Sequence, residues 1–146
     1  MVTKPDSNVI LLSIKPEFAD AIMSGEKTVE FRRWKFTPHA EHVVIYSSQP
    51  VQKVVGYFQI AGIERASKTT LWEKYGECGA ISRSDLFAYL DNVSSALAIR
   101  VGPCWMLRKG VSLRGIANCA PQSFAYLTPL AWQRVLQQPT TVVRPA

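Results

Sequence analysis

Residues 10–35 constrain the fold more than any other part of the chain. They read ILLSIKPEFADAIMSGEKTVEFRRWK, with an apolar run, apolar residues at helical spacing, a glycine turn and an alternating run. An apolar run that ends at a proline predicts a strand, and proline suits the first position of the helix that follows. Gly25 suits the left-handed position after a helix. The segment therefore predicts strand, helix, tight turn and second strand, with charges gathered where the turn meets the strand.

The rest of the chain predicts more strands with helices inserted between them. Predicted strands cover residues 43–46, 53–63, 95–101 and 104–107. Gly56 interrupts the second of these and predicts a bulge or a close backbone approach. Capping patterns predict helices that start at Thr70 and Ser82, and a last helix that starts at Thr128 and is stopped by Pro139. This arrangement is typical of an α+β fold.

The length and composition indicate one ordinary domain. A chain of 146 residues with 47% hydrophobic residues is long and apolar enough to bury a core. The polar or proline-containing ends predict a flexible segment over residues 1–8 and a flexible tail over residues 139–146, so the domain is expected over residues 9–138.

Several features indicate a cytoplasmic protein without a membrane partner. No apolar run approaches the ~20 residues that span a bilayer, and no secretory signal pattern is present at the start of the sequence. The three cysteines are widely spaced and odd in number, which argues against a disulfide framework and fits a reducing compartment.

The net charge of +6 comes entirely from the last third of the chain. Residues 1–91 hold 11 Lys and Arg against 11 Asp and Glu, which cancel. Residues 92–146 hold six Lys and Arg and no acid. A region of one sign attracts polyanions through phosphate contacts and counterion release, so nucleic acid or nucleotide is a candidate partner. A soluble protein that is simply basic remains the alternative.

Four motifs, taken in order along the chain, carry a resemblance to a known family. They are SIKP at residues 13–16, SGEKTVEFRR at 24–33, IYSSQPV at 45–51 and PQSF at 121–124. Together they resemble the ASCH domain, a branch of the PUA-like fold, over roughly residues 9–137. The resemblance implies a single small β-barrel flanked by helices, a cleft lined by residues 25–33, and contact with RNA or nucleotides. Some members resemble RNA-binding or regulatory modules, one group hydrolyses an acetylated cytidine, and ribonuclease activity occurs in the family.

Lys27 and Glu30 are the candidate catalytic residues. Lys27 lies where a turn meets a strand, and partial desolvation there would lower its pKa toward that of a nucleophile or base; the alternative is a solvated turn lysine. The resemblance implies that Lys27 matches a catalytic lysine of the acetylcytidine hydrolases. Glu30 could serve as a general base or accept a hydrogen bond from a base edge, or it could only pair with Arg32. The hydrolases carry a threonine at this position, so Glu30 departs from their pattern.

The spacing of Lys27 and Glu30 sets a geometric condition on a shared site. In a regular strand, residues three apart point to opposite faces. The two side chains therefore reach one site only if Lys27 still belongs to the turn or if the strand bulges.

Further candidates for ligand contact surround this pair. Arg32 and Arg33 are adjacent on a strand, so one should point inward and one outward, and a guanidinium can grip phosphate bidentately. The alternative for each is a rim charge. Lys15 precedes the helix and is a candidate phosphate or base contact, or an ordinary residue at the end of a strand.

Polar and aromatic residues after two other motifs complete the candidate set. Tyr46 could stack on a base, or its ring could lie in the barrel. Ser47 could bind phosphate or only shape the turn before a proline, and Ser123 follows Pro121 in a basic stretch and could lie in the cleft.

Metal and cofactor sites are not predicted. The only histidines are His39 and His42, no cysteine pair has C-x-x-C spacing, and neither a glycine-rich phosphate loop nor a catalytic-triad signature occurs. We therefore expect no metal and no cofactor.

Residues 70–90 could also be interpreted as a DNA-binding helix-turn-helix. Its second helix would carry Asp85 and Asp91, which repel phosphate, with Arg83 as its one cation.

The sequence leaves three functional hypotheses open. The first is a protein that binds RNA, a nucleotide or a nucleoside in a charged cleft around residues 25–33. The second is a metal-independent hydrolase, either a ribonuclease or an amidohydrolase acting on a nucleoside such as N4-acetylcytidine, with Lys27 and Glu30 catalytic. The third, less favoured, is a DNA-binding transcriptional regulator that uses Arg83.

Overall fold

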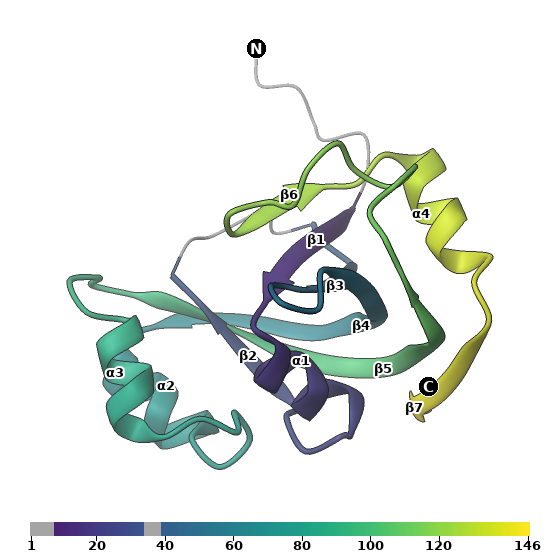
Figure 1. Ribbon diagram of the computed structural model, residues 1–146. Helices are drawn as coiled ribbons and strands as arrows, with labels where there is room; N and C mark the ends of the chain where they lie inside the picture. Colours follow the sequence, from purple (N-terminus) through teal and green to yellow (C-terminus); the bar gives the residue numbers. More distant parts are fainter. Residues whose placement is uncertain (1–7, 34–38) are drawn as a thin grey trace.

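Two long antiparallel strands organise the computed structural model, which describes residues 8–33 and 39–146 (Figure 1). They are β4 (Lys53–Ala66) and β5 (Ala96–Val111), and they pair from Val54 opposite Val111 to Ala66 opposite Ala96. Three register shifts interrupt this pairing. Because bulges bend and twist strands, the sheet curls instead of lying flat. One shift falls between Val54 and Gly56, which confirms the bulge expected at Gly56.

Among the described residues, five shorter strands complete a seven-stranded mixed sheet. These are β1 (Val9–Ile14), β2 (Val29–Arg32), β3 (His42–Ser47), β6 (Phe124–Tyr126) and β7 (Thr140–Arg144). The order is β2-β5-β4-β3-β1-β6, with β7 also paired to β5. β1 and β3 run parallel and the other pairs are antiparallel. The curled sheet forms a half-barrel, and the predicted α+β fold with helices around a small barrel is confirmed.

In the described part of the chain, four helices flank the sheet: α1 (Pro16–Met23), α2 (Lys68–Tyr75), α3 (Arg83–Tyr89) and α4 (Pro129–Leu136). Figure 1 shows α2 and α3 together beyond one end of the β4–β5 pair and α4 on the opposite side of the molecule. The Ser82 and Thr128 side chains cap α3 and α4, as predicted. Gly25 follows α1 with φ +84°, the left-handed conformation expected there. None of the helices in these described ranges is long and apolar enough to cross a bilayer.

The core explains why β1 is apolar throughout. Ile10, Leu12 and Ile14 pack in a cluster with α1, whereas Val9 and Leu11 pack in a second cluster on the other face with α4. A strand covered on both faces carries a continuous apolar run instead of an alternating one. A third cluster joins α2 and α3 to the β2–β5 edge, with these members: Val29, Phe31, Leu71, Leu86, Leu90, Ala96 and Ala98.

The structure corrects three predicted boundaries. α2 is capped by Ser67, whose side chain accepts from the Thr70 amide, so Thr70 lies inside the helix that it was expected to start. Residues 96–111 form one strand where two were predicted. The tail expected over residues 139–146 contains β7, which pairs with β5. Apart from Asn8, the N-terminal segment predicted over residues 1–8 lies outside the described residues.

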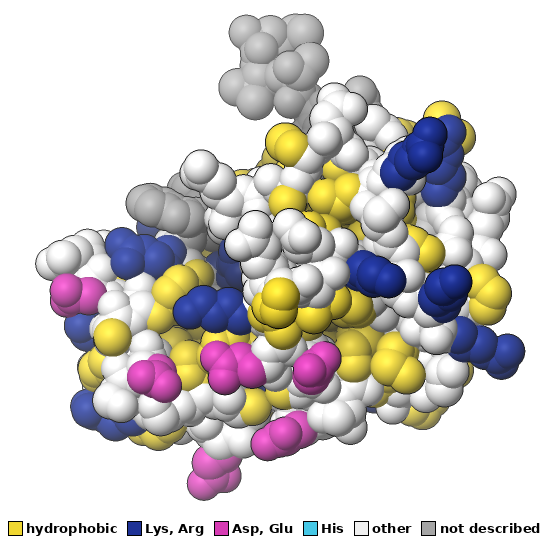
Figure 2. All heavy atoms as spheres, viewed as in Figure 1, with side chains coloured by type: hydrophobic (Ala, Val, Ile, Leu, Met, Phe, Trp, Pro, Cys, Tyr) yellow, Lys and Arg dark blue, Asp and Glu magenta, His cyan; other side chains and the backbone are white. Residues whose placement is uncertain are grey.

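The acidic side chains occupy only one part of the surface seen in Figure 2. Figure 2 shows Asp and Glu gathered over the lower part of the molecule, around the helices near α1, α2 and α3. Lys and Arg also lie on that side, but over the far part of β5 and α4 the view shows Lys and Arg without Asp or Glu. The charge imbalance along the sequence is therefore also an imbalance in space.

We predict that Ser67→Ala destabilises the protein by about 1 kcal/mol, because the Thr70 amide at the start of α2 loses the hydroxyl that caps it. Thr70→Ala is the matched control. It removes the Thr70 hydroxyl, which accepts a hydrogen bond from Ser67, and keeps the Thr70 amide that Ser67 caps. Urea denaturation of both variants measures the difference. An equal loss in Thr70→Ala would contradict the assignment of Ser67 as the cap.

Candidate functional site

A cavity of about 870 Å³ opens where the ends of several elements meet. The contributing parts are the ends of β1 and β3, the start of α1, the strand β2, one face of α3, and residues 120–123. β1 and β3 are parallel, so their carboxyl ends reach the same edge of the sheet. The cleft therefore forms where the chain leaves the sheet, which is where loops and helix ends can present side chains.

Seven of the eight predicted site residues line this cavity. They are Lys15, Lys27, Glu30, Arg32, Arg33, Tyr46 and Ser123. Ser47 does not line it, although Tyr46 and Ser48 on either side do. Neighbours on a strand point to opposite faces, and Ser47 is 1% exposed on the far side, where its hydroxyl has no hydrogen-bond partner among the described residues.

Lys27 is buried, with 2% of its surface exposed. Its ammonium donates to the Gly79 carbonyl and lies 3.4 Å from the Glu30 carboxylate. It also lies over the rings of Phe18 and Phe31, 5.1 and 5.5 Å from their centroids. Burial lowers the pKa of Lys27, and the nearby Glu30 carboxylate opposes that shift. The alternative of a solvated turn lysine is therefore wrong.

The geometric condition on Lys27 and Glu30 is met by the turn. β2 begins at Val29, so Lys27 precedes the strand and its side chain is free of the strand alternation. The Lys27 amide donates to Ala21 in α1, which fixes the turn beneath the helix. The two charged groups consequently share one cleft.

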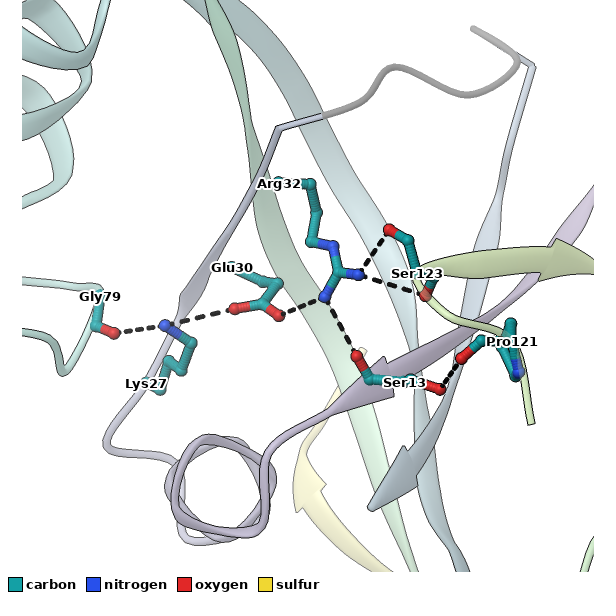
Figure 3. Close-up of polar contacts among 7 residues, drawn as sticks. All are labelled: Ser13, Lys27, Glu30, Arg32, Gly79, Pro121 and Ser123. Carbon is teal, nitrogen blue, oxygen red and sulfur yellow. Dashed lines mark hydrogen bonds and ion pairs between the residues drawn. The ribbon is translucent and has the colours of Figure 1, made fainter. Parts of the chain in front are cut away.

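Arg32 joins the same buried group from the other side (Figure 3). Its guanidinium lies 3.4 Å from Glu30 and donates to the Ser13 carbonyl at 3.2 Å. It also donates to the carbonyl and hydroxyl of Ser123, at 3.1 and 2.7 Å. Glu30 thus lies between two cations, and Arg32 ties β2 to the end of β1 and to the segment before β6.

Arg33 directly follows β2 and lines the same cavity as Arg32, although a regular strand would turn the two side chains to opposite faces. It is half-buried, lines the cavity and donates to the Tyr89 carbonyl of α3 at 2.9 Å. Lys15 is exposed at the rim of the cavity. Among the predicted cations, Lys15 and Arg33 are therefore the ones that a ligand can reach from solvent.

The two alternatives for Tyr46 are both partly realised. Its ring is 6% exposed and packs in the core cluster that contains Leu11 and Val44. The same residue also lines the cavity. It therefore supplies an apolar wall, with little of its ring free to contact a ligand.

Other lining residues were not singled out in the sequence. Asp85, Ala88 and Tyr89 lie on the cavity side of α3, and Gln49 and Gln52 contribute from the β3–β4 turn. The α3 residues follow the i, i+3, i+4 spacing of one helix face, which is a signal that the sequence carries. That signal does not say what the face covers, because α3 reaches the cavity through long-range packing.

The arrangement places fixed charge beneath an open, partly apolar cleft. Lys27, Glu30 and Arg32 supply two cationic groups against one carboxylate on the floor. Phe18 and Phe31 supply aromatic walls. Such a site can hold an anionic ligand with a flat ring system, and Glu30 can accept a proton or a hydrogen bond. Within residues 8–33 and 39–146, no group of three or more His, Cys, Asp or Glu side chains could hold a metal ion.

Comparison with known proteins identifies relatives that contain an ASCH domain. A family model for the ASCH domain matches residues 12–107. An "ASCH domain-containing ribonuclease" of Zymomonas mobilis is 36% identical over 99 residues, which cover 67% of each chain. The crystal structure of ASCH from Zymomonas mobilis superposes with a TM-score of 0.81 at 29% identity, over 95% of this chain and 99% of that one.

Two further matches are one solved structure and one sequence relative. The N-terminal domain of Staphylothermus marinus McrB has a TM-score of 0.59 at 12% identity, over 91% of this chain and 95% of that one, which shows a shared fold. A protein named "ATP synthase subunit alpha" in Ureaplasma parvum is 32% identical over 130 residues. That match covers 86% of this chain and spans 16% of the Ureaplasma protein.

The lowered pKa of Lys27 predicts a specific dependence of stability on pH. Between that lowered pKa and the ordinary value of 10.5, the unfolded chain binds more protons at Lys27 than the folded chain does. The contribution of Lys27 to the free energy of unfolding therefore rises as pH increases through this window.

Lys27→Met provides the comparison, since it keeps the length of the side chain and removes the charge. We expect the free energy of unfolding of wild type, minus that of Lys27→Met, to increase as pH rises toward the ordinary lysine value of 10.5. Urea denaturation at a series of pH values measures it, and titrating groups that do not contact Lys27 cancel in the difference. A difference that stays constant or falls would contradict a lowered pKa for Lys27.

Proposed function

Because the chain belongs to the ASCH domain family, we propose that it binds RNA in the cleft above Lys27, Glu30 and Arg32. The observation that carries the proposal is the placement of two buried cations and one carboxylate under a cavity of about 870 Å³ with aromatic walls. This volume falls in the usual range for small-ligand sites, so a short piece of a single strand fits. The ribonuclease name of the Zymomonas relative supports RNA as the class of ligand.

The proposed contacts follow from the chemistry of the lining residues. Lys15 and Arg33 at the accessible part of the cleft hold phosphates, and the half-buried ring of Phe18 stacks against an unpaired base. Glu30 and Asp85 accept hydrogen bonds from base edges or from a 2′-hydroxyl. Lys27 and Arg32 act from the floor, where low exposure strengthens their electrostatic effect on a bound anion.

A ribonuclease is the second candidate function, favoured by the 36% identity to the Zymomonas protein of that name. Cleavage by the 2′-hydroxyl requires a group that accepts its proton and cations that offset charge on the phosphoryl oxygens. In this proposal Glu30 accepts the proton, and the 2′-oxygen attacks phosphorus to form a 2′,3′-cyclic phosphate. The bond to the 5′-oxygen breaks, and that oxygen leaves as a hydroxyl after taking a proton from water. Lys27 and Arg32 stabilise the charge that develops.

The other hypotheses receive less support. The acetylcytidine hydrolases carry a threonine where this chain has Glu30. Hydrolysis of N4-acetylcytidine is therefore measured only as a parallel assay in the test below. We do not extend the proposal to a helix-turn-helix regulator, because α3 lines the cleft and its Arg83 lies over the Phe87 ring, 4.1 Å from the centroid.

RNA binding predicts a change in salt dependence when a rim cation is neutralised. Lys15→Gln and Arg33→Gln should each weaken binding and reduce the slope of log K against log salt by about 0.7, the value for one contact to a single strand. Fluorescence anisotropy with a labelled single-stranded RNA at several salt concentrations measures both effects. Lys68→Gln on α2, outside the cleft, should leave the slope unchanged. Unchanged slopes in both cleft variants would count against the proposed contacts.

RNA cleavage predicts that activity depends on the buried pair. We expect Lys27→Met and Glu30→Gln each to reduce the rate of single-stranded RNA cleavage by roughly 10²–10⁴-fold, with chelator present throughout. Mass spectrometry identifies the products, and N4-acetylcytidine is tested in parallel. Lys68→Gln, purified in the same way, controls for a contaminating nuclease. Cleavage that persists in both cleft variants would assign the activity to another site or protein, and intact RNA that remains bound would leave a binding function.

A further inference from the structure

A second cationic surface lies outside the cleft and is not used by the proposed site. We define it as the basic band, formed by Lys53, Arg108, Lys109, Arg114 and Arg134. All five residues are exposed, and they lie at the start of β4, the end of β5, the loop after β5, and α4. Figure 2 shows Lys and Arg side chains gathered over this side of the molecule. None of these residues lines the cleft cavity.

The basic band has one sign. Residues 53–63 and 96–144 contain no Asp or Glu, so the segments that build the band supply no carboxylate to neutralise it. Arg108 and Lys109 are neighbours near the end of β5, and both are exposed. Arg134 donates to the Gly115 carbonyl, which holds α4 against the loop that carries Arg114. The charge is therefore concentrated and held on packed elements.

The basic band is continuous with the cleft along two chain segments. Gln49 and Gln52 line the cleft, and Lys53 follows them directly. The Lys53 side chain lies beside Gly110, immediately after Lys109. On the other side, the chain runs from Arg114 to the cleft-lining residues 120–123. A single-stranded nucleic acid that leaves the cleft past either segment would therefore meet the basic band next.

We propose that the basic band binds the phosphate backbone of single-stranded RNA that extends out of the cleft. This inference rests on the proposed function and adds a second, sequence-independent contact surface to it. Exposed cations release counterions when they bind phosphates, so each one adds affinity and salt dependence without reading the bases. The bases that occupy the cleft would then be selected there, while the basic band would favour longer strands. Charge complementarity favours RNA as its occupant.

The test compares a short and a long RNA on the same proteins. Labelled oligouridylates of about 4 and about 16 nucleotides are titrated at several salt concentrations. Wild type should bind the long RNA more tightly and with a steeper salt slope. The triple variant Arg108→Gln/Lys109→Gln/Arg114→Gln should bind the short RNA as wild type does. Its slope for the long RNA should fall by about 2, for three lost contacts at about 0.7 each.

Two controls separate charge at the basic band from other effects. Lys68→Gln/Lys74→Gln/Arg83→Gln removes the same net charge from α2 and α3 and should leave binding of both RNAs unchanged. Arg108→Lys/Arg114→Lys keeps the charge and should bind the long RNA as wild type does, whereas a loss there would point to altered structure. Thermal unfolding checks that each variant is folded.

The outcomes distinguish this proposal from the function on which it rests. If wild type binds neither RNA, the proposed function fails and the basic band proposal fails with it. If wild type binds both RNAs equally, or if the triple variant keeps the long-RNA slope, the function stands and the basic band proposal is wrong. An equal loss in the α2–α3 control would also overturn it, because net charge alone would then explain the effect.

Discussion

The structure depends on the requirement that buried charges be compensated. No more than 8% of the surface of Lys27, Glu30 or Arg32 is exposed. Burial of any one of these charges without the others would be strongly unfavourable. Together with the Gly79 carbonyl and Ser123 they form one connected polar group. These groups come from the turn after α1, from β2, from the α2–α3 connection and from the segment before β6. Satisfying them therefore brings together the four segments that surround the cleft.

The same requirement explains how turns and interhelical connections can form a well-ordered ligand site. Turns and interhelical connections usually vary in position, but here the Lys27 ammonium anchors the α2–α3 connection through Gly79 and the ring of Phe31 packs on that glycine. Moving α3 away from the cleft would leave a buried ammonium without its carbonyl partner. The charges on the floor are consequently oriented before any ligand arrives, which reduces the cost of ordering them on binding.

Local sequence signals predicted the parts of the fold that local interactions decide. The strand, helix and turn up to Gly25, and the caps at Ser82 and Thr128, follow from proline, glycine and hydroxyl chemistry within a few residues. β7 was missed because its pairing with β5 is a long-range event, and Ser67 was missed because Thr70 has equal capping chemistry and only packing of the helix decides between them. The turn before β2 places Lys27 and Glu30 in one cleft. The contribution of α3 to the wall of that cleft depends on tertiary packing, which residue spacing alone does not encode.

The outer strands of the sheet are short, which bears on how the protein avoids aggregation. β2 has four residues, β6 three and β7 five, while the strands of 14 and 16 residues lie inside. β2 and β7 cover successive stretches of one edge of β5, and Pro103, which has no amide hydrogen to donate, falls between them. A second chain would therefore find few unpaired backbone groups to extend the sheet, so the long apolar strands are protected against edge-to-edge association.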